Sequence, residues 1–121
     1  MKGVLETIKL AENKKWKIGL ASSSSMKIIN SVLEKLSIKQ YFDSIHSAEN
    51  EEYGKPHPQV FISAAKNLNV LPEECMVIED SINGVIAAKA AKMKVIAVPE
   101  MKELSFPQFT IADQILGDLT D

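Results

Sequence analysis

The 121-residue sequence contains no arginine, and all 14 of its basic residues are lysines. Arginine is the residue whose planar guanidinium binds phosphate or carboxylate through two parallel hydrogen bonds. Phosphate recognition by this chain would therefore depend on lysine as a point charge, on backbone amides and on hydroxyl groups. The net charge is −2, so no basic field draws the chain to nucleic acid or to anionic lipid.

Cysteine and long apolar runs are also scarce. The single cysteine, Cys75, excludes an internal disulfide framework and fits a reducing cytosol, so we expect a cytoplasmic location. No apolar run approaches the roughly 18–20 residues of a membrane span, and the N-terminus lacks the apolar segment of a signal peptide. The composition is 45% apolar and 25% charged, which is ordinary for a globular protein, and the length predicts one domain.

Strand-like and helix-like patterns alternate along the chain, which predicts an α/β fold with a parallel sheet and crossover helices. The expected helices cover residues 4–15, 26–36, 58–68 and 82–93, and the expected strands cover 17–21, 44–47, 75–78 and 95–98. The strand at 75–78 has the clearest character of a buried strand. Residues 100–110 are expected to form a loop, and residues 111–119 a poorly defined tail.

Polar side chains gather where two of these strands end. Glu79 and Asp80 follow one strand, and a run of four serines that begins at Ser22 follows another. In an open parallel sheet, ligands bind outside the carboxyl ends of the strands. Lys55 lies in a Gly-Lys-Pro-His-Pro turn before the helix that leads into the acidic strand, so it can return to the same edge. We therefore predict that the serines, the lysine and the two carboxylates converge.

The two adjacent carboxylates predict a cation site. Acids at the end of a buried strand are costly to desolvate unless they hold a cation or pair with a lysine. Asp80 is predicted to be a ligand of Mg²⁺, with a role as helix cap as the alternative. Glu79 would orient metal-bound water or pair with Lys55, and its alternative is a solvated strand end. Ser81 is expected to be a helix cap rather than a ligand.

The serine run and the lysine predict a phosphate site. The Ser22 hydroxyl and the Ser23 amide would donate to phosphate oxygens, while one of the four serines can cap the following helix. Lys55 would neutralise charge between the phosphoryl group and the carboxylates, and its alternative is a solvated surface lysine. His46 and His57 have no metal-ligand spacing, so we expect no role for them in the chemistry.

Three segments resemble motifs of the haloacid dehalogenase-like (HAD) superfamily, in the branch of β-phosphoglucomutase and the 2-deoxyglucose-6-phosphate and hexitol phosphate phosphatases. They are Ala21–Ser24, Gly54–Phe61 and Ile78–Val85. The resemblance implies a Rossmann-like core and Mg²⁺-dependent phosphoryl transfer through an aspartyl-phosphate. It also implies that Ser22 binds phosphate, that Lys55 balances charge, and that Glu79 with Asp80 forms the acidic metal-site pair.

One motif of that family does not occur in the sequence. The family's Asp-x-Asp-Gly motif supplies the nucleophile and the general acid, whereas the aspartates here are Asp43, Asp80, Asp113, Asp118 and Asp121. The resemblance therefore implies that residues 1–121 form a single, partial core domain without a cap domain. In the family, the strand of the nucleophile lies between the strands that end here at Ala21 and Glu79. Without it, those two strands would have unpaired edges, unless they close up or another segment fills the gap.

These observations lead to one expected function and two alternatives. We expect the core of a hexose or hexitol phosphate phosphatase that is inactive on its own because its nucleophile segment is absent from this chain. The tail from Pro107 to Leu119 resembles that of the deoxyglucose and hexitol phosphatases, which favours a phosphatase over the first alternative, a phosphomutase like β-phosphoglucomutase. The second alternative is a non-catalytic module that binds phosphate or a partner chain. Expected partners are a small phosphorylated sugar or sugar alcohol and an N-terminal segment or second chain.

Overall fold

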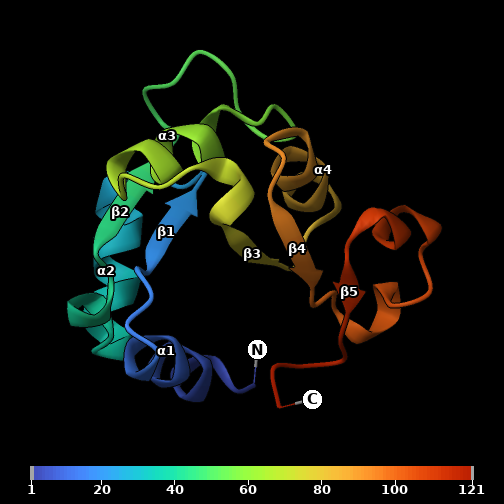
Figure 1. Cartoon of the computed structure of the whole chain (residues 1–121), viewed down its shortest axis with the longest axis horizontal. Helices are drawn as coiled ribbons and strands as arrows, with labels where there is room; N and C mark the ends of the chain where they lie inside the picture. The colour runs from blue at the N-terminus through green and yellow to red at the C-terminus, as the bar shows by residue number, and fades with distance from the viewer. Residues whose placement is uncertain (1, 121) are drawn as a thin grey trace.

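The computed structural model describes residues 2–120, which fold into two parallel sheets flanked by helices (Figure 1). One sheet pairs β1 (Gly19–Ser22) with β2 (Ser44–Ser47), and Ser22 lies opposite Ser47. The other has the order β3-β4-β5, with β3 at Met76–Glu79, β4 at Lys94–Ala97 and β5 at Gln114–Ile115. All of these pairings are parallel, so the predicted α/β fold with a parallel arrangement is confirmed.

The α-helices of the described region are α1 (Val4–Asn13), α2 (Met26–Leu36), α3 (Gln59–Asn67) and α4 (Ile82–Ala90). Short 3₁₀ segments lie at Lys39–Tyr41, Pro72–Glu74, Met101–Glu103 and Pro107–Ile111. The start of α2 has a local cause, because the Ser25 hydroxyl accepts a hydrogen bond from the Ile28 amide at 3.3 Å. Across residues 2–120 we find no helix long and apolar enough to cross a membrane.

The two central helices connect the sheets. α3 packs on β1 and β2, α4 packs on β3 and β4, and α3 contacts α4. The largest fully buried side chains of the described region are Phe109, Val60, Val85 and Val95. They come from α3, α4, β4 and the 3₁₀ segment near the C-terminus, so side-chain packing joins the two sheets.

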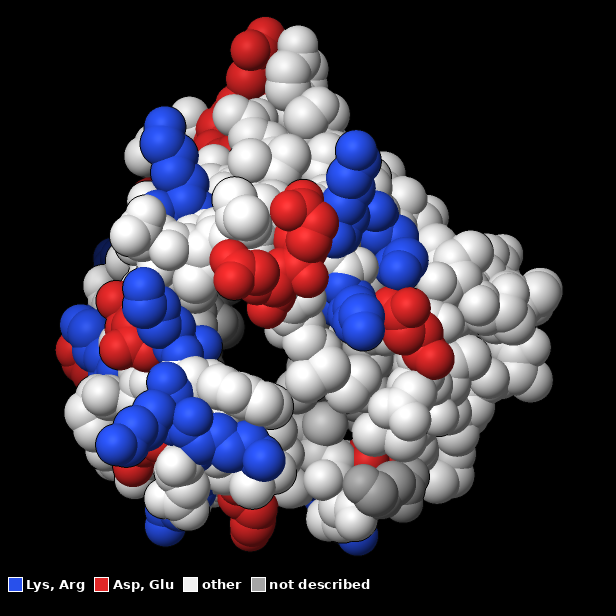
Figure 2. Space-filling view, in the orientation of Figure 1, with Lys and Arg blue, Asp and Glu red and all other residues white. Residues whose placement is uncertain are grey.

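No strand pairing joins β1 to β3 within residues 2–120. Hydrogen bonds pair each of these strands on one side alone, and the space-filling view is hollowed between the two halves of the molecule (Figure 2). The strands have therefore not closed up, and no other described segment has filled the gap. Each keeps an edge of unpaired backbone groups.

The expectation that the strand at 75–78 is the most buried one was wrong. Met76 is 51% exposed and Ile78 is 38% exposed. Successive side chains of a strand point to opposite faces, and α4 covers the face that carries Glu79. An apolar run shows that a strand can be buried, but it does not show whether a neighbouring element is present to cover it.

The expected tail contains a short strand, β5, which pairs in parallel with β4. A side chain fixes the entry to this strand, since Asp113 Oδ2 accepts hydrogen bonds from the Val95 amide at 2.8 Å and from Lys89 Nζ at 3.0 Å. The Val95 amide, followed by Lys89, lowers the pKa of the Asp113 carboxyl group. The Asp113 carboxylate, together with the backbone pairing of β5, therefore joins the expected tail to β4 and α4.

This arrangement predicts a dependence of stability on pH. A carboxyl group whose pKa is lower in the folded state stabilises the fold above its unfolded pKa, and that contribution is lost as pH falls through the folded pKa. We expect acidification from about pH 6 to about pH 3 to lower the thermal unfolding midpoint more steeply in the unchanged chain than in Asp113→Asn. Circular dichroism melts across this range would measure it, and parallel curves for the two proteins would contradict it.

Candidate functional site

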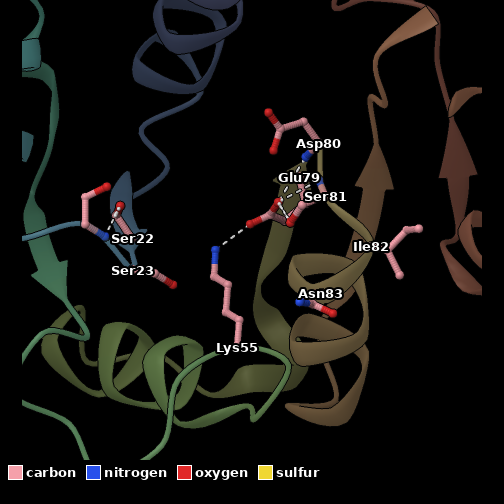
Figure 3. Close-up of a pocket in the computed structure, with 9 residues that line it drawn as sticks. Ser22, Ser23, Lys55, Glu79, Asp80, Ser81, Ile82 and Asn83 are labelled. Atoms are coloured by element: carbon pink, nitrogen blue, oxygen red, sulfur yellow. Dashed lines mark hydrogen bonds and ion pairs between the residues drawn. The ribbon is translucent and has the colours of Figure 1, made fainter. Parts of the chain in front are cut away.

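An open pocket of about 620 Å³ lies between the ends of β1 and β3 (Figure 3). Its lining comprises Ser22, Ser23, Ser24, Lys55, Glu79, Asp80, Ser81, Ile82 and Asn83. The serines follow β1, the carboxylates end β3, and the lysine precedes α3. The structure thus brings together, from three separate segments, the side chains that the sequence analysis selected.

A buried ion pair crosses this pocket. Lys55 Nζ lies 2.5 Å from Glu79 Oε1, and the two side chains are only 13% and 10% exposed. The ammonium group also lies 4.9 Å from the centre of the Phe61 ring, where the electron-rich face of the ring attracts a cation. Because Lys55 leads into α3 and Glu79 ends β3, the pair connects the two halves of the molecule.

The second oxygen of Glu79 is also occupied. Glu79 Oε2 accepts from the Asp80 amide at 3.0 Å and from the amide and hydroxyl of Ser81, each at 3.2 Å. Gly84 packs so closely on this carboxylate that an added Cβ would overlap it. Of the two roles predicted for Glu79, the structure therefore shows the one in which it pairs with Lys55.

Asp80 is the freer of the two acids. The residue as a whole is exposed, and it lines the pocket with its carboxylate partly covered by its neighbours. Partial burial raises the pKa of Asp80, and the negative charge of Glu79 raises it further, whereas Lys55 acts in the opposite direction. A cation placed beside Asp80 would favour the ionised carboxylate.

The two carboxylates of the pocket fit Mg²⁺ only if water and a bound phosphate supply the rest of its ligands. Among residues 2–120, no group of three or more His, Cys, Asp or Glu side chains is arranged to hold a metal. Mg²⁺ in phosphoryl-transfer sites usually takes one or two carboxylates and completes its shell with water and substrate phosphate. Asp80, with Glu79 next to it in the chain, satisfies the carboxylate part of that requirement beside the serines and Lys55 of the pocket.

The serines divide their roles between capping and the pocket. Ser25 caps α2, as one member of the run was expected to do, while Ser22, Ser23 and Ser24 line the pocket. Ser81 caps α4, since its hydroxyl accepts from the Gly84 amide at 3.0 Å, and this confirms its predicted role. The same residue therefore starts α4 and helps to hold the Glu79 carboxylate.

Two lining residues, Ile82 and Asn83, were not selected from the sequence, and Ser24 was included only as a member of the serine run. The signal for Asn83 was its place in the first turn of the helix after the acidic strand, because such a turn faces the same sheet edge as the strand end. The close packing of α4 on the end of β3 occurs at Gly84, whereas the neighbouring Asn83 lies in the pocket lining.

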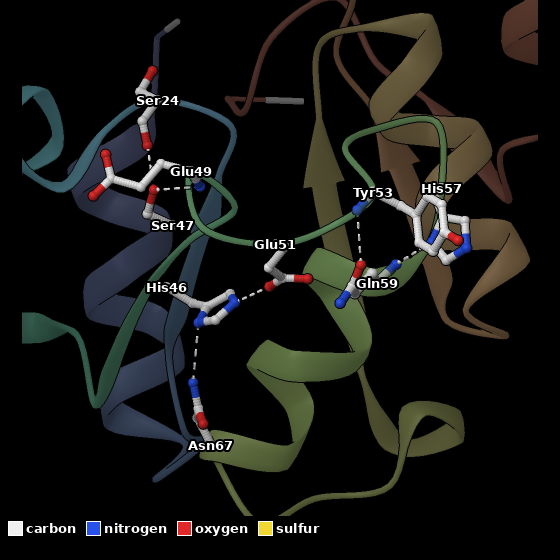
Figure 4. Close-up of polar contacts among 9 residues, drawn as sticks. All are labelled: Ser24, His46, Ser47, Glu49, Glu51, Tyr53, His57, Gln59 and Asn67. Carbon is white, nitrogen blue, oxygen red and sulfur yellow. Dashed lines mark hydrogen bonds and ion pairs between the residues drawn. The ribbon is translucent and has the colours of Figure 1, made fainter.

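The two histidines lie outside this pocket lining, in two separate groups of polar contacts, His46 in β2 and His57 in the loop before α3 (Figure 4). His46 Nε2 pairs with Glu51 Oε1, and His46 Nδ1 lies 3.3 Å from the side-chain nitrogen Nδ2 of Asn67. The ring of His57 stacks on that of Tyr53, with 4.6 Å between the ring centres. These contacts fasten the loop between β2 and α3, which leads to Lys55.

Comparison with known proteins finds a matching family and related proteins. The family described as haloacid dehalogenase-like hydrolase matches residues 1–98. Hexitol phosphatase B of Escherichia coli (strain K12) is 41% identical over 119 residues, which make up 98% of this chain and 54% of that protein. The chain thus spans about half the length of this relative.

Two solved structures with the same fold are also about twice as long as this chain. The β-phosphoglucomutase of Clostridium difficile superimposes with a TM-score of 0.84 at 32% identity, covering 97% of this chain and 49% of that one. CbbY of Rhodobacter sphaeroides, solved in complex with phosphate, superimposes with a TM-score of 0.90 at 25% identity, covering 99% of this chain and 54% of that one.

Proposed function

The chain belongs to the haloacid dehalogenase-like hydrolase family, and we propose that it forms the phosphate-binding half of a sugar-phosphate phosphatase site. One observation carries the proposal, namely the pocket in which Ser22, Lys55, Glu79 and Asp80 meet from three segments. Similarity to hexitol phosphatase B supports a hexose or hexitol phosphate as the substrate. We place the protein in the cytoplasm, acting on a small phosphorylated sugar or sugar alcohol and not on nucleic acid or membranes.

The pocket residues would act on the phosphoryl group by charge and hydrogen bonding. The Ser22 hydroxyl and the Ser23 amide would donate to phosphate oxygens, and Lys55 would offset negative charge that develops on them. Mg²⁺, held by Asp80 with Glu79 behind it, would supply further positive charge at the same oxygens. Such groups bind and neutralise a phosphate, and they leave open which group attacks it.

The attacking group would come from outside the described residues. Glu79 is held by Lys55 and by the start of α4, and Asp80 is assigned to the cation. We propose that an N-terminal segment or a second chain adds a parallel strand between β1 and β3 and supplies the Asp-x-Asp motif there. The unpaired edges of both strands and the hollow between them support this placement.

A phosphomutase is the second candidate. The superposition on the β-phosphoglucomutase of Clostridium difficile favours it, because a mutase would use the same pocket to hold the transferring phosphoryl group. The two candidates share every role given above to the residues of this chain. They differ in whether water or a second sugar hydroxyl accepts the phosphoryl group.

Phosphate binding tests the part of the proposal that this chain can fulfil alone. We expect Ser22→Ala to weaken the binding of inorganic phosphate about three- to tenfold, since one hydrogen bond to a charged acceptor is lost. Titration of the isotopically labelled chain, followed by amide chemical shifts, would measure the dissociation constant. Ser105→Ala, an exposed serine outside the pocket, is the matched control and should leave it unchanged. Absence of any phosphate response in the unchanged chain would contradict the proposal.

A further inference from the structure

Ser47, the last residue of β2, lies outside the pocket lining but is bonded to the loop that forms one wall of it. Its hydroxyl donates to the Ser24 carbonyl oxygen at 2.5 Å, across 23 residues of sequence (Figure 4). We call residues 22–25 the serine loop. The Ser47–Ser24 hydrogen bond links the serine loop to the neighbouring strand β2 through a side chain.

The backbone ladder to β2 reaches only the first residue of the serine loop. The β1–β2 ladder ends where the Ala48 amide donates to the Ser22 carbonyl at 2.9 Å. Ser23 and Ser24 follow β1 and lie beyond that ladder. The Ser47 hydroxyl extends the connection by two residues, to the part of the loop that turns into α2.

A further contact holds the Ser47 hydroxyl oxygen in place. The Ser47 hydroxyl oxygen accepts from the Glu49 amide at 3.1 Å. A serine hydroxyl carries one hydrogen and two lone pairs. Because the Ser24 carbonyl can only accept, the hydrogen goes to it, while the Glu49 amide occupies a lone pair and helps to hold Ser47 as a donor toward the serine loop.

The way Ser47 holds Ser24 also affects the Ser22 hydroxyl, which faces the pocket. The Ser24 amide donates to Ser22 Oγ at 3.1 Å, which occupies a lone pair of that oxygen and leaves its hydrogen available to an anion. Because a peptide is planar and trans, holding the Ser24 carbonyl toward β2 also turns the next amide, that of Ser25, in the opposite direction. If the carbonyl were released, its negative end could turn toward the pocket and oppose a bound phosphate.

We propose that Ser47 is a positioning residue for phosphate binding. Its hydroxyl holds the serine loop in the conformation in which the Ser22 hydroxyl donates into the pocket and the Ser24 carbonyl points away from it. The inference rests on the proposed function of the pocket and adds a residue to it that does not touch the phosphate itself.

Phosphate titration of three variants of the 121-residue chain tests this role. We expect Ser47→Ala to raise the dissociation constant for inorganic phosphate about three- to tenfold, and Ser47→Thr, which keeps the hydroxyl, to retain the affinity of the unchanged chain. Thr110→Ala is the matched control. It removes a hydroxyl that donates to the Pro107 carbonyl at 2.6 Å, outside the pocket lining, and should leave the dissociation constant unchanged.

The outcomes separate this inference from the proposed function. Equal phosphate affinity in Ser47→Ala and the unchanged chain, with weaker binding in Ser22→Ala, would overturn the role of Ser47 and leave the pocket assignment standing. Equal weakening in Ser47→Ala and Thr110→Ala would also overturn it, because the effect would then be general loosening. Failure of Ser47→Thr to bind like the unchanged chain would do the same. No phosphate response in the unchanged chain would overturn both.

Discussion

Gly84→Ala is expected to destabilise the fold by about 2 kcal/mol or more, although alanine is by itself about 1 kcal/mol better than glycine within a helix. The new Cβ would overlap the Glu79 carboxylate, which is buried and bonded to Lys55 and to the start of α4. The carboxylate would have to move, and a buried charge that loses its partner is strongly unfavourable. Urea unfolding followed by circular dichroism would measure the change in the free energy of unfolding.

Gly54→Ala is the matched control, because the same Cβ added at that position meets no atom within 4 Å. We expect its free energy of unfolding to stay within about 0.5 kcal/mol of the unchanged chain. A second check is a double-mutant cycle with Glu79→Ala, in which the cost of Gly84→Ala should shrink because the overlapping group has been removed. A Gly84→Ala chain as stable as the unchanged one would show that the carboxylate can move without cost.

The Lys55–Glu79 pair has a structural role beside its place in the pocket. α3, which Lys55 precedes, packs on the β1–β2 sheet, and Glu79 ends a strand of the other sheet. Because no strand pairing joins the sheets within residues 2–120, this pair adds a charged contact to the apolar contact between α3 and α4. Substitution of Lys55 would therefore change stability and phosphate binding together, which is why Ser22 and Ser47 are better probes of the pocket.

The site could be predicted from the sequence because its residues stand at strand ends and helix starts. Ser22, Lys55 and Asp80 are placed by topology, and the residues that cap α2 and α4 are short hydroxyl side chains in the expected positions. The bounds predicted for α2 are those found in the structure, since its apolar spacing and its cap agree. Where the apolar spacing and the capping residue indicate the same helix, these local patterns are sufficient to predict its bounds.

The features that could not be predicted from the sequence depend on contacts between segments that are distant along the chain. The exposure of Met76 and Ile78 follows from the absence of a covering element on their face of β3 within the described residues. A bond between the Asp113 side chain and the Val95 amide adds to the pairing of β5 with β4, and a bond from the Ser47 side chain adds to the pairing of the serine loop with β2. No periodicity in the sequence reports such pairings, because each joins residues 18 or 23 positions apart.

The chain alone is expected to show no measurable turnover of hexose or hexitol phosphates with Mg²⁺ present. Hydrolysis through an aspartyl-phosphate needs a carboxylate in line with the phosphorus atom and a proton donor at the leaving oxygen. Within the described part of the chain, the acids of the pocket are Glu79, which is held by Lys55, and Asp80, which is assigned to the cation. Release of inorganic phosphate from these substrates would measure turnover.

A segment with the Asp-x-Asp motif, fused to the chain or added as a second polypeptide, should restore turnover. It would place a parallel strand on the unpaired edges of β1 and β3, and so bring its first aspartate beside Ser22 and Lys55. Because loss of a nucleophile costs on the order of 10⁴-fold or more in rate, the gain should be large. It should depend on both the first aspartate of the segment and an unaltered Asp80.

Three comparisons show whether this division of the site is right. The same segment with its first aspartate changed to asparagine should still bind the chain but give no turnover, which separates assembly from chemistry. The complete segment with Asp80→Asn in the chain should also be inactive if that carboxylate holds the cation. Robust turnover by the 121-residue chain alone, lost in Asp80→Ala, would contradict the half-site proposal and would require a nucleophile among its own residues.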